Sequence, residues 1–106
     1  MNPARPFDLH PLAAKDINDI WEHIALDNAQ AAGRVREEFI RSLHNLAVFP
    51  NQGHKRPDLT SRPVRFKLVR EYLIVYAPDK HPLLVLAVVH GRRSPRVIAA
   101  ILQGRQ

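Results

Sequence analysis

The spacing of apolar residues changes partway along this sequence, from a helical period to a strand period. Before "FPNQG" at residues 49–53, apolar residues recur at steps of three and four, which predicts two amphipathic helices. Pro11 suits the first turn of the first helix, and Asp27 with Asn28 supplies a break and a cap for the second. Because the connection is short, the two helices should form an antiparallel hairpin. The predicted inward stripes are Ala13, Ile17, Ile20, Trp21 and Ile24, then Ala32, Val35, Phe39, Leu43 and Leu46.

A period of two begins after a polar loop at residues 50–62. A half-buried strand is predicted where Val64, Phe66 and Leu68 alternate with Arg65, Lys67 and Val69. Two further segments, "YLIVYA" at 72–77 and "LLVLAVV" at 83–89, are apolar throughout, as in central strands covered on both faces. "PDKHP" between them has the composition of a turn. A short strand is also predicted at residues 7–10, "FDLH".

The chain should end in a short helix, because Ser94 is a favourable N-cap and Pro95 a favourable first residue. Its apolar side would consist of Val97, Ile98, Ile101 and Leu102. The predicted order is therefore β-α-α-β-β-β-α, an α+β domain whose antiparallel helical hairpin packs on one face of a small, mainly antiparallel sheet. We expect an exposed apolar patch on the other face, where a partner would bind. The alternative is that loops and the short helix cover that face.

Length and composition exclude several classes of protein. A chain of 106 residues suffices for one hydrophobic core, so we expect a single domain over residues 1–106. The absence of cysteine excludes disulfides and cysteine-ligated metals, and it fits a reducing cytoplasm. The N-terminus lacks the apolar region of a signal peptide. The longest apolar run is seven residues, against the ~20 that cross a bilayer, so no membrane association is expected.

The net charge of +6 is unevenly distributed. Residues 1–53 carry five Lys and Arg against seven Asp and Glu, whereas residues 54–106 carry eleven against three. A basic half favours an acidic partner such as nucleic acid, an acidic protein or anionic lipid; a solvated face is the alternative.

Several cations follow the most apolar strand, in "VVHGRRSPRV" at residues 88–97. Arg96 falls in the first turn of the predicted helix, where a cation is unfavourable by about 0.3–1 kcal/mol. A docked anion would explain such an accumulation of positive charge, because helix N-termini attract anions. A hydrated turn that protects the sheet edge is the alternative.

The order of elements, with "PNQG" after the second helix, "YLIVY" in the sheet and "VVHGRR" at the end of the last strand, resembles the RelE/ParE superfamily of type II toxins. The resemblance extends over roughly residues 7–102. It implies one of two activities. RelE-like toxins are ribosome-dependent mRNA endonucleases, whereas ParE-like toxins inhibit DNA gyrase and lack the nuclease residues.

The residues favour the ParE-like branch. Cutting RNA through its 2′-hydroxyl requires a base, an acid and cations at the phosphate. By resemblance, a nuclease would carry an arginine directly after Tyr72, where this chain has Leu73. It would often carry a tyrosine near the C-terminus, where this chain has Val97 and Ile98. The alternative nuclease hypothesis relies on His90, Arg65, Arg92 and Arg93, with Lys55, Arg56 and Lys67 close by.

The ParE-like resemblance implies a cytoplasmic, non-catalytic toxin that binds DNA gyrase and is neutralised by a cognate ParD-like antitoxin in a hetero-oligomer. Candidate contacts for the target or the antitoxin are Arg65, His90, Arg92, Arg93 and Arg96. Direct contact with nucleic acid is compatible with the charge but not required. No cofactor or metal is expected, because the histidines lack ligand spacing and no glycine-rich phosphate loop is present. A non-toxic member that only binds its partner is a further alternative.

Overall fold

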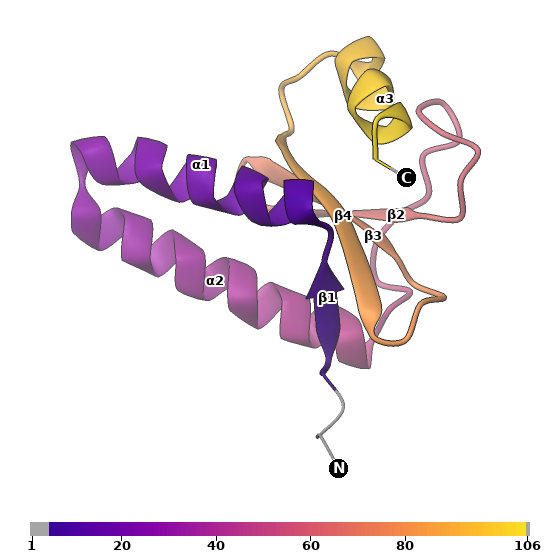
Figure 1. Ribbon diagram of the computed structural model, residues 1–106, viewed down its shortest axis with the longest axis horizontal. Coiled ribbons are helices and arrows are strands. Elements are labelled where there is room, and N and C mark those ends of the chain that lie inside the picture. Colours follow the sequence, from indigo (N-terminus) through magenta and orange to yellow (C-terminus); the bar gives the residue numbers. More distant parts are fainter. Residues whose placement is uncertain (1–4, 106) are drawn as a thin grey trace.

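The computed structural model describes residues 5–105 and confirms the predicted order β-α-α-β-β-β-α. A four-stranded sheet in the order β1-β4-β3-β2 forms its centre, with helices on both faces (Figure 1). β1 runs parallel to β4, and the other neighbours are antiparallel. The elements are β1 (Phe7–Leu9), α1 (Pro11–Asp27), α2 (Ala29–Val48), β2 (Arg65–Val69), β3 (Tyr72–Ala77), β4 (Leu83–His90) and α3 (Pro95–Gln103).

Local capping produces the tight helical hairpin. His10, predicted as the end of the first strand, instead caps α1, and its Nδ1 accepts a hydrogen bond of 3.1 Å from the backbone N–H of Leu12. Asn28 ends α1 by donating its N–H to the Ile24 carbonyl, and its Oδ1 accepts from the N–H of Ala31 to begin α2. One residue therefore serves both helices. The hairpin extends well beyond the sheet (Figure 1).

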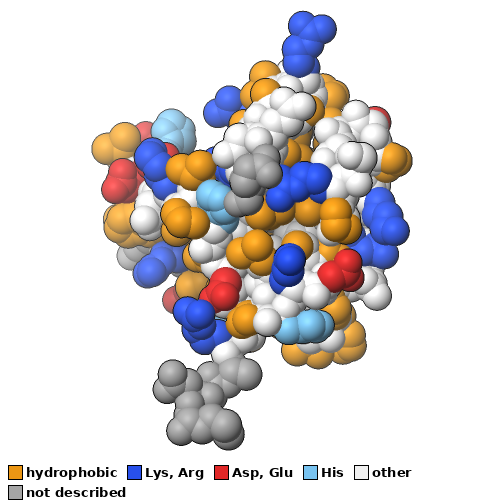
Figure 2. Space-filling view, turned by 45° about the vertical axis from the view of Figure 1, so that its right-hand side comes forward, with side chains coloured by type: hydrophobic (Ala, Val, Ile, Leu, Met, Phe, Trp, Pro, Cys, Tyr) orange, Lys and Arg blue, Asp and Glu red, His pale blue; other side chains and the backbone are white. Residues whose placement is uncertain are grey.

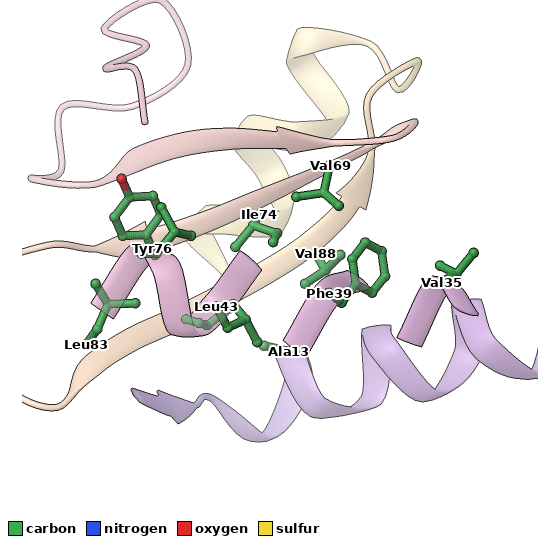
Figure 3. Close-up of a cluster of buried hydrophobic side chains, with 11 residues drawn as sticks. Ala13, Val35, Phe39, Leu43, Val69, Ile74, Tyr76, Leu83 and Val88 are labelled. Atoms are coloured by element: carbon green, nitrogen blue, oxygen red, sulfur yellow. The ribbon is translucent and has the colours of Figure 1, made fainter. Parts of the chain in front are cut away.

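The first hydrophobic cluster lies between the hairpin and one face of the sheet. Phe39 and Leu43 of α2 point towards the sheet, where Ile74 and Val88 meet them (Figure 3). Ile17, Ile20 and Ile24 of α1 pack against the cluster, as predicted. Trp21 does not, and its predicted burial is wrong. It remains 40% exposed because these isoleucines occupy the inward positions of α1.

A second cluster fills the opposite face, so the expected large exposed patch there is wrong. Ile98 and Leu102 of α3 contribute to it, and the polar loop contributes Leu59 and Val64. A register shift at Val75/Tyr76 helps, since it turns two successive residues of β4, Leu86 and Ala87, towards this face. Of the large apolar residues on this side, Leu68 of β2 is 59% exposed.

An ion pair joins the end of the chain to the rest of the fold. The guanidinium of Arg105 binds the Asp16 carboxylate of α1, with one N–O distance of 3.0 Å, and also donates to the Leu86 carbonyl at 3.1 Å. Asp16 accepts from the N–H of Val88 at 2.9 Å. β1 has only three residues, so the later part of β4 has no neighbouring strand on that edge of the sheet. There the backbone of β4 binds to the Asp16–Arg105 pair. The end of α3 is thereby held against α1 and the sheet.

Candidate functional site

The three arginines near the end of the sheet lie on the connection between β4 and α3. We call residues 91–96 the basic turn; its arginines, Arg92, Arg93 and Arg96, are all exposed. The N–H of Gly91 donates to the Glu71 carbonyl at 2.7 Å, and the N–H of Arg93 donates to the His90 carbonyl at 3.1 Å. The first bond ties the turn to the β2–β3 connection, and the second closes the turn against the end of β4.

The two ring nitrogens of His90 link the turn to Glu71. Its Nδ1 accepts a hydrogen bond of 3.0 Å from the N–H of Arg92, and its Nε2 lies 3.1 Å from the Glu71 carboxylate. Since Nδ1 accepts, the proton belongs on Nε2, which donates to Glu71. The ring also packs edge-to-face against Tyr72, with centroids 5.3 Å apart. Both ring nitrogens and one edge of the ring are therefore engaged by neighbours within the chain.

The start of α3 adds to the positive character of the turn. Ser94 caps the helix, with its Oγ accepting from the N–H of Val97 at 3.3 Å. The first turn of α3 contains no acid. Within residues 5–105, no carboxylate lies within ion-pair distance of the basic turn's arginines. A helix N-terminus and three exposed arginines thus lie within six consecutive residues, which favours anions at this end of the sheet.

Arg65 lies at the other end of the sheet. It pairs with Tyr76 in the β2–β3 register, whereas His90 pairs with Tyr72 at the opposite end of β3, about 14 Å away for four residues of strand. Its guanidinium donates to the carbonyls of Gly53 at 2.8 Å and Asn51 at 3.4 Å. The structure therefore does not bring Arg65 together with the basic turn, and this arginine supports a loop instead.

The other cations named with Arg65 are also away from the turn. Lys67 is opposite Ile74, in the middle of β2. Arg56 lies in the loop and binds Asp58 at 2.8 Å; the hydrogen bond from Arg56 is the main reason that the pKa of Asp58 is lowered. Lys55 is an exposed loop residue beside His54, which bridges to β2.

Leu73 occupies the position where the nuclease hypothesis needs an arginine, and it packs against the second cluster. It is paired with Leu68 on one side and Val89 on the other. Leu68 reaches the basic turn: its Cδ1 lies 3.8 Å from the place that a Cβ on Gly91 would take. An exposed apolar side chain thus lies beside Gly91, the first residue of the basic turn. Basic and apolar side chains are interspersed on the side that Figure 2 presents, with fewer acidic ones.

Tyr76 joins two of the motifs, a relationship that sequence reasoning missed. Its hydroxyl donates to the Pro50 carbonyl at 2.7 Å and accepts from the N–H of Gly53 at 2.9 Å. "PNQG" and "YLIVY" therefore form one structural unit. Burial raises the pKa of Tyr76. The signal was present: a tyrosine in a buried strand needs a polar partner, and a turn of polar residues can supply one.

Two further kinds of site are not found in the described part of the chain. Among residues 5–105, no three His, Cys, Asp or Glu side chains are grouped so that they could hold an ion. In the same part of the chain, no helix combines the length and apolarity needed to cross a bilayer.

This β-α-α-β-β-β-α arrangement is the one expected from the resemblance to the RelE/ParE superfamily. Comparison with family models gives a match over residues 7–95, to the ParE toxin of the type II toxin–antitoxin system, parDE. The chain belongs to this family. A search of curated proteins gave no match. Membership implies a cognate antitoxin as partner. The match includes Arg92 and Arg93 and ends where α3 begins.

Proposed function

We propose that this toxin acts in the bacterial cytoplasm by binding DNA gyrase and inhibiting it, without breaking a covalent bond itself. The observation that carries the proposal is the state of His90. Its Nδ1 accepts from the backbone N–H of Arg92 and its Nε2 contacts Glu71, which supports a role in presenting the arginines and not in catalysis. Leu73 also supplies no positive charge at the position where a nuclease would stabilise the phosphate during RNA cleavage.

The proposed contact surface combines the basic turn with Leu68. Arginine is favoured at interfaces because its planar guanidinium binds carboxylate or phosphate in two places. Leu68 adds apolar area directly beside it. A surface of this kind fits an acidic, partly apolar region of a protein, or DNA held by that protein.

The antitoxin would neutralise the same surface. We propose that it lays an amphipathic segment over Leu68 and brings carboxylates to the arginines of the basic turn. Such an interaction is charge-dependent, so the affinity for antitoxin should fall as salt is raised. Loss of a labile antitoxin would expose the cationic and the apolar parts of the surface together.

A supercoiling assay with purified gyrase tests the proposal. The purified toxin should inhibit supercoiling or trap cleaved DNA, and the variant Arg92→Ala/Arg93→Ala should lose this effect while remaining folded. Arg34→Ala/Arg36→Ala is the matched control, because it removes two exposed arginines of α2 away from the turn. Retained inhibition in the Arg92/Arg93 variant would contradict a role for the basic turn.

Two other outcomes identify the rival functions. Primer extension on messages after induction would show discrete, codon-positioned cuts if the protein were a ribosome-dependent nuclease. Normal growth of cells that express soluble, folded protein without antitoxin would mean that this member only binds its partner.

A further inference from the structure

A cavity lies between the tip of the helical hairpin and the end of the sheet, on the other side of His90 from the basic turn's backbone contact. It has a volume of about 520 Å³. Ile24, Ala31 and Val35 of the two helices line it with apolar surface. Asp27, from the end of α1, and Glu71, from the β2–β3 connection, contribute carboxylates. We call this cavity the hairpin cleft. Its size is within the range of small-ligand sites.

The carboxylates of the hairpin cleft are poorly satisfied within the chain. Asp27 is the last residue of α1, where a negative charge opposes the helix dipole. Within residues 5–105, it has no cation at ion-pair distance. The Glu71 side chain is largely exposed, and in that set its carboxylate pairs only with the His90 ring. The negative charge of Asp27 therefore lowers the stability of α1, and a bound cation would offset this effect.

The other titratable groups of the cleft do not reverse its charge. Arg70 is the one lysine or arginine that lines the cleft, and the Nε of Arg70 is bound to Glu38 of α2. His23 and His90 line the cleft as well, as does Tyr72. Tyr72 adds an aromatic wall, which favours a cation next to it. The cleft thus carries more carboxylates than cations, in a chain whose net charge is +6.

We propose that the hairpin cleft takes up an arginine or lysine side chain of the antitoxin. The aliphatic stem would lie on Ile24 and Val35, and the charged head would reach Asp27 and Glu71. An apolar floor with an acidic rim suits such a side chain, because its stem is apolar and its end is charged. The inference rests on the antitoxin as partner and is independent of gyrase as target.

The two sites would then bind opposite charges on one partner. Carboxylates of the antitoxin would meet the basic turn, and one of its cations would enter the hairpin cleft. Since His90 contacts Glu71 and also the backbone of Arg92, the two sites adjoin each other through this residue. An antitoxin segment shifted along this surface would place like charges together, so the pair of sites would select one register.

Amide NMR shifts of the full chain, titrated with N-acetyl-arginine amide, test the inference. We expect saturable shifts at Asp27, Tyr72 and His90, and none of this kind with N-acetyl-norleucine amide, which has no charge. Asp27→Asn should weaken binding roughly tenfold, as expected for loss of a charged hydrogen-bonding partner. Its thermal midpoint should stay equal or rise, because the substitution removes a charge that opposes the helix dipole.

Asp79→Asn is the matched control, since it removes an exposed carboxylate from the β3–β4 turn. It should bind the probe as the unmodified chain does. Absence of saturable shifts around the cleft, shifts spread equally over Asp58 and Asp79, or equal binding by Asp27→Asn would each overturn the inference. None of these results depends on a gyrase assay, so failure here is distinct from failure of the proposed function.

Discussion

The Nδ1 atom of His90 accepts a hydrogen bond of 3.0 Å from the backbone N–H of Arg92. This contact reproduces with imidazole what an asparagine side chain does when it binds the N–H two residues on. Through this contact, the orientation of the basic turn depends on His90, whose ring contacts Glu71 and Tyr72. His90 is therefore a positioning residue for the arginines.

Replacing His90 should separate this role from catalysis. His90→Ala removes the acceptor and should weaken antitoxin binding roughly three- to tenfold, the effect of one hydrogen bond of about 0.5–1.5 kcal/mol. His90→Asn should largely retain the affinity, because its Oδ1 can accept from Arg92. Calorimetric titration with antitoxin, with hydrogen exchange of the Arg92 amide, measures both effects. Equal losses in the two variants would contradict a positioning role, and RNA cleavage abolished by both would point to a base.

The contact between Gly53 and Tyr76 should tolerate no added methyl group. A Cβ on Gly53 would lie 2.6 Å from the Tyr76 hydroxyl and 2.9 Å from the Phe66 carbonyl oxygen. Gly53→Ala should therefore lower the free energy of unfolding by about 1–3 kcal/mol. Gly33→Ala is the control, and its expected effect has the opposite sign. A Cβ on Gly33, in α2, would meet no atom within 4 Å, so alanine should raise the free energy of unfolding by about 1 kcal/mol. Urea denaturation measures both, and a neutral Gly53→Ala would contradict the close packing.

Stability should fall at alkaline pH in a way that depends on Tyr76. Burial is the main cause that raises the pKa of Tyr72 and that of Tyr76 above the ordinary value of 10.0. The folded state therefore retains these protons after the unfolded state has lost them. The contribution of the two protonated tyrosine hydroxyls to stability is complete below about pH 10, and it is lost as pH rises through their folded-state pKa.

Tyr76→Phe isolates this contribution. It should be less stable at neutral pH by about 1–3 kcal/mol, because the Gly53 N–H and the Pro50 carbonyl lose their partner. Its stability should then decline less steeply above about pH 10 than that of the parent chain. Urea midpoints at increasing pH, with tyrosinate absorbance, provide the comparison. Parallel declines in both proteins would assign the effect to other groups.

The Asp16–Arg105 pair should contribute more to stability than an exposed ion pair. Its side chains are only 18% and 11% exposed, and Asp16 also accepts from the backbone of β4. Asp16→Asn should lower the free energy of unfolding by about 2–4 kcal/mol, because it leaves a largely buried guanidinium without its counter-charge. Asp19→Asn, which breaks an exposed pair with Lys15, is the control and should have little effect. Comparable losses in the two variants would contradict this ranking.

Much of the fold could be predicted because local interactions specify it. The change of apolar period located the helices and the main strands, since a helix and a strand expose different positions to a core. Asn28 and Ser94 were identifiable as caps because a cap binds the backbone only a few residues away. The basic turn was equally visible, as a run of cations between a strand and a cap.

The sequence by itself thus determined the elements, their order and the charged segment, because each depends on neighbours within a few residues. Only the tertiary structure decided which residues meet. The register of β2, β3 and β4 separated Arg65 from His90 and placed His90 beside Glu71. Packing of the loop through Leu59, not its polar composition, closed the second face of the sheet. These contacts join distant parts of the chain, and their geometry follows from strand register and packing, which no local pattern specifies.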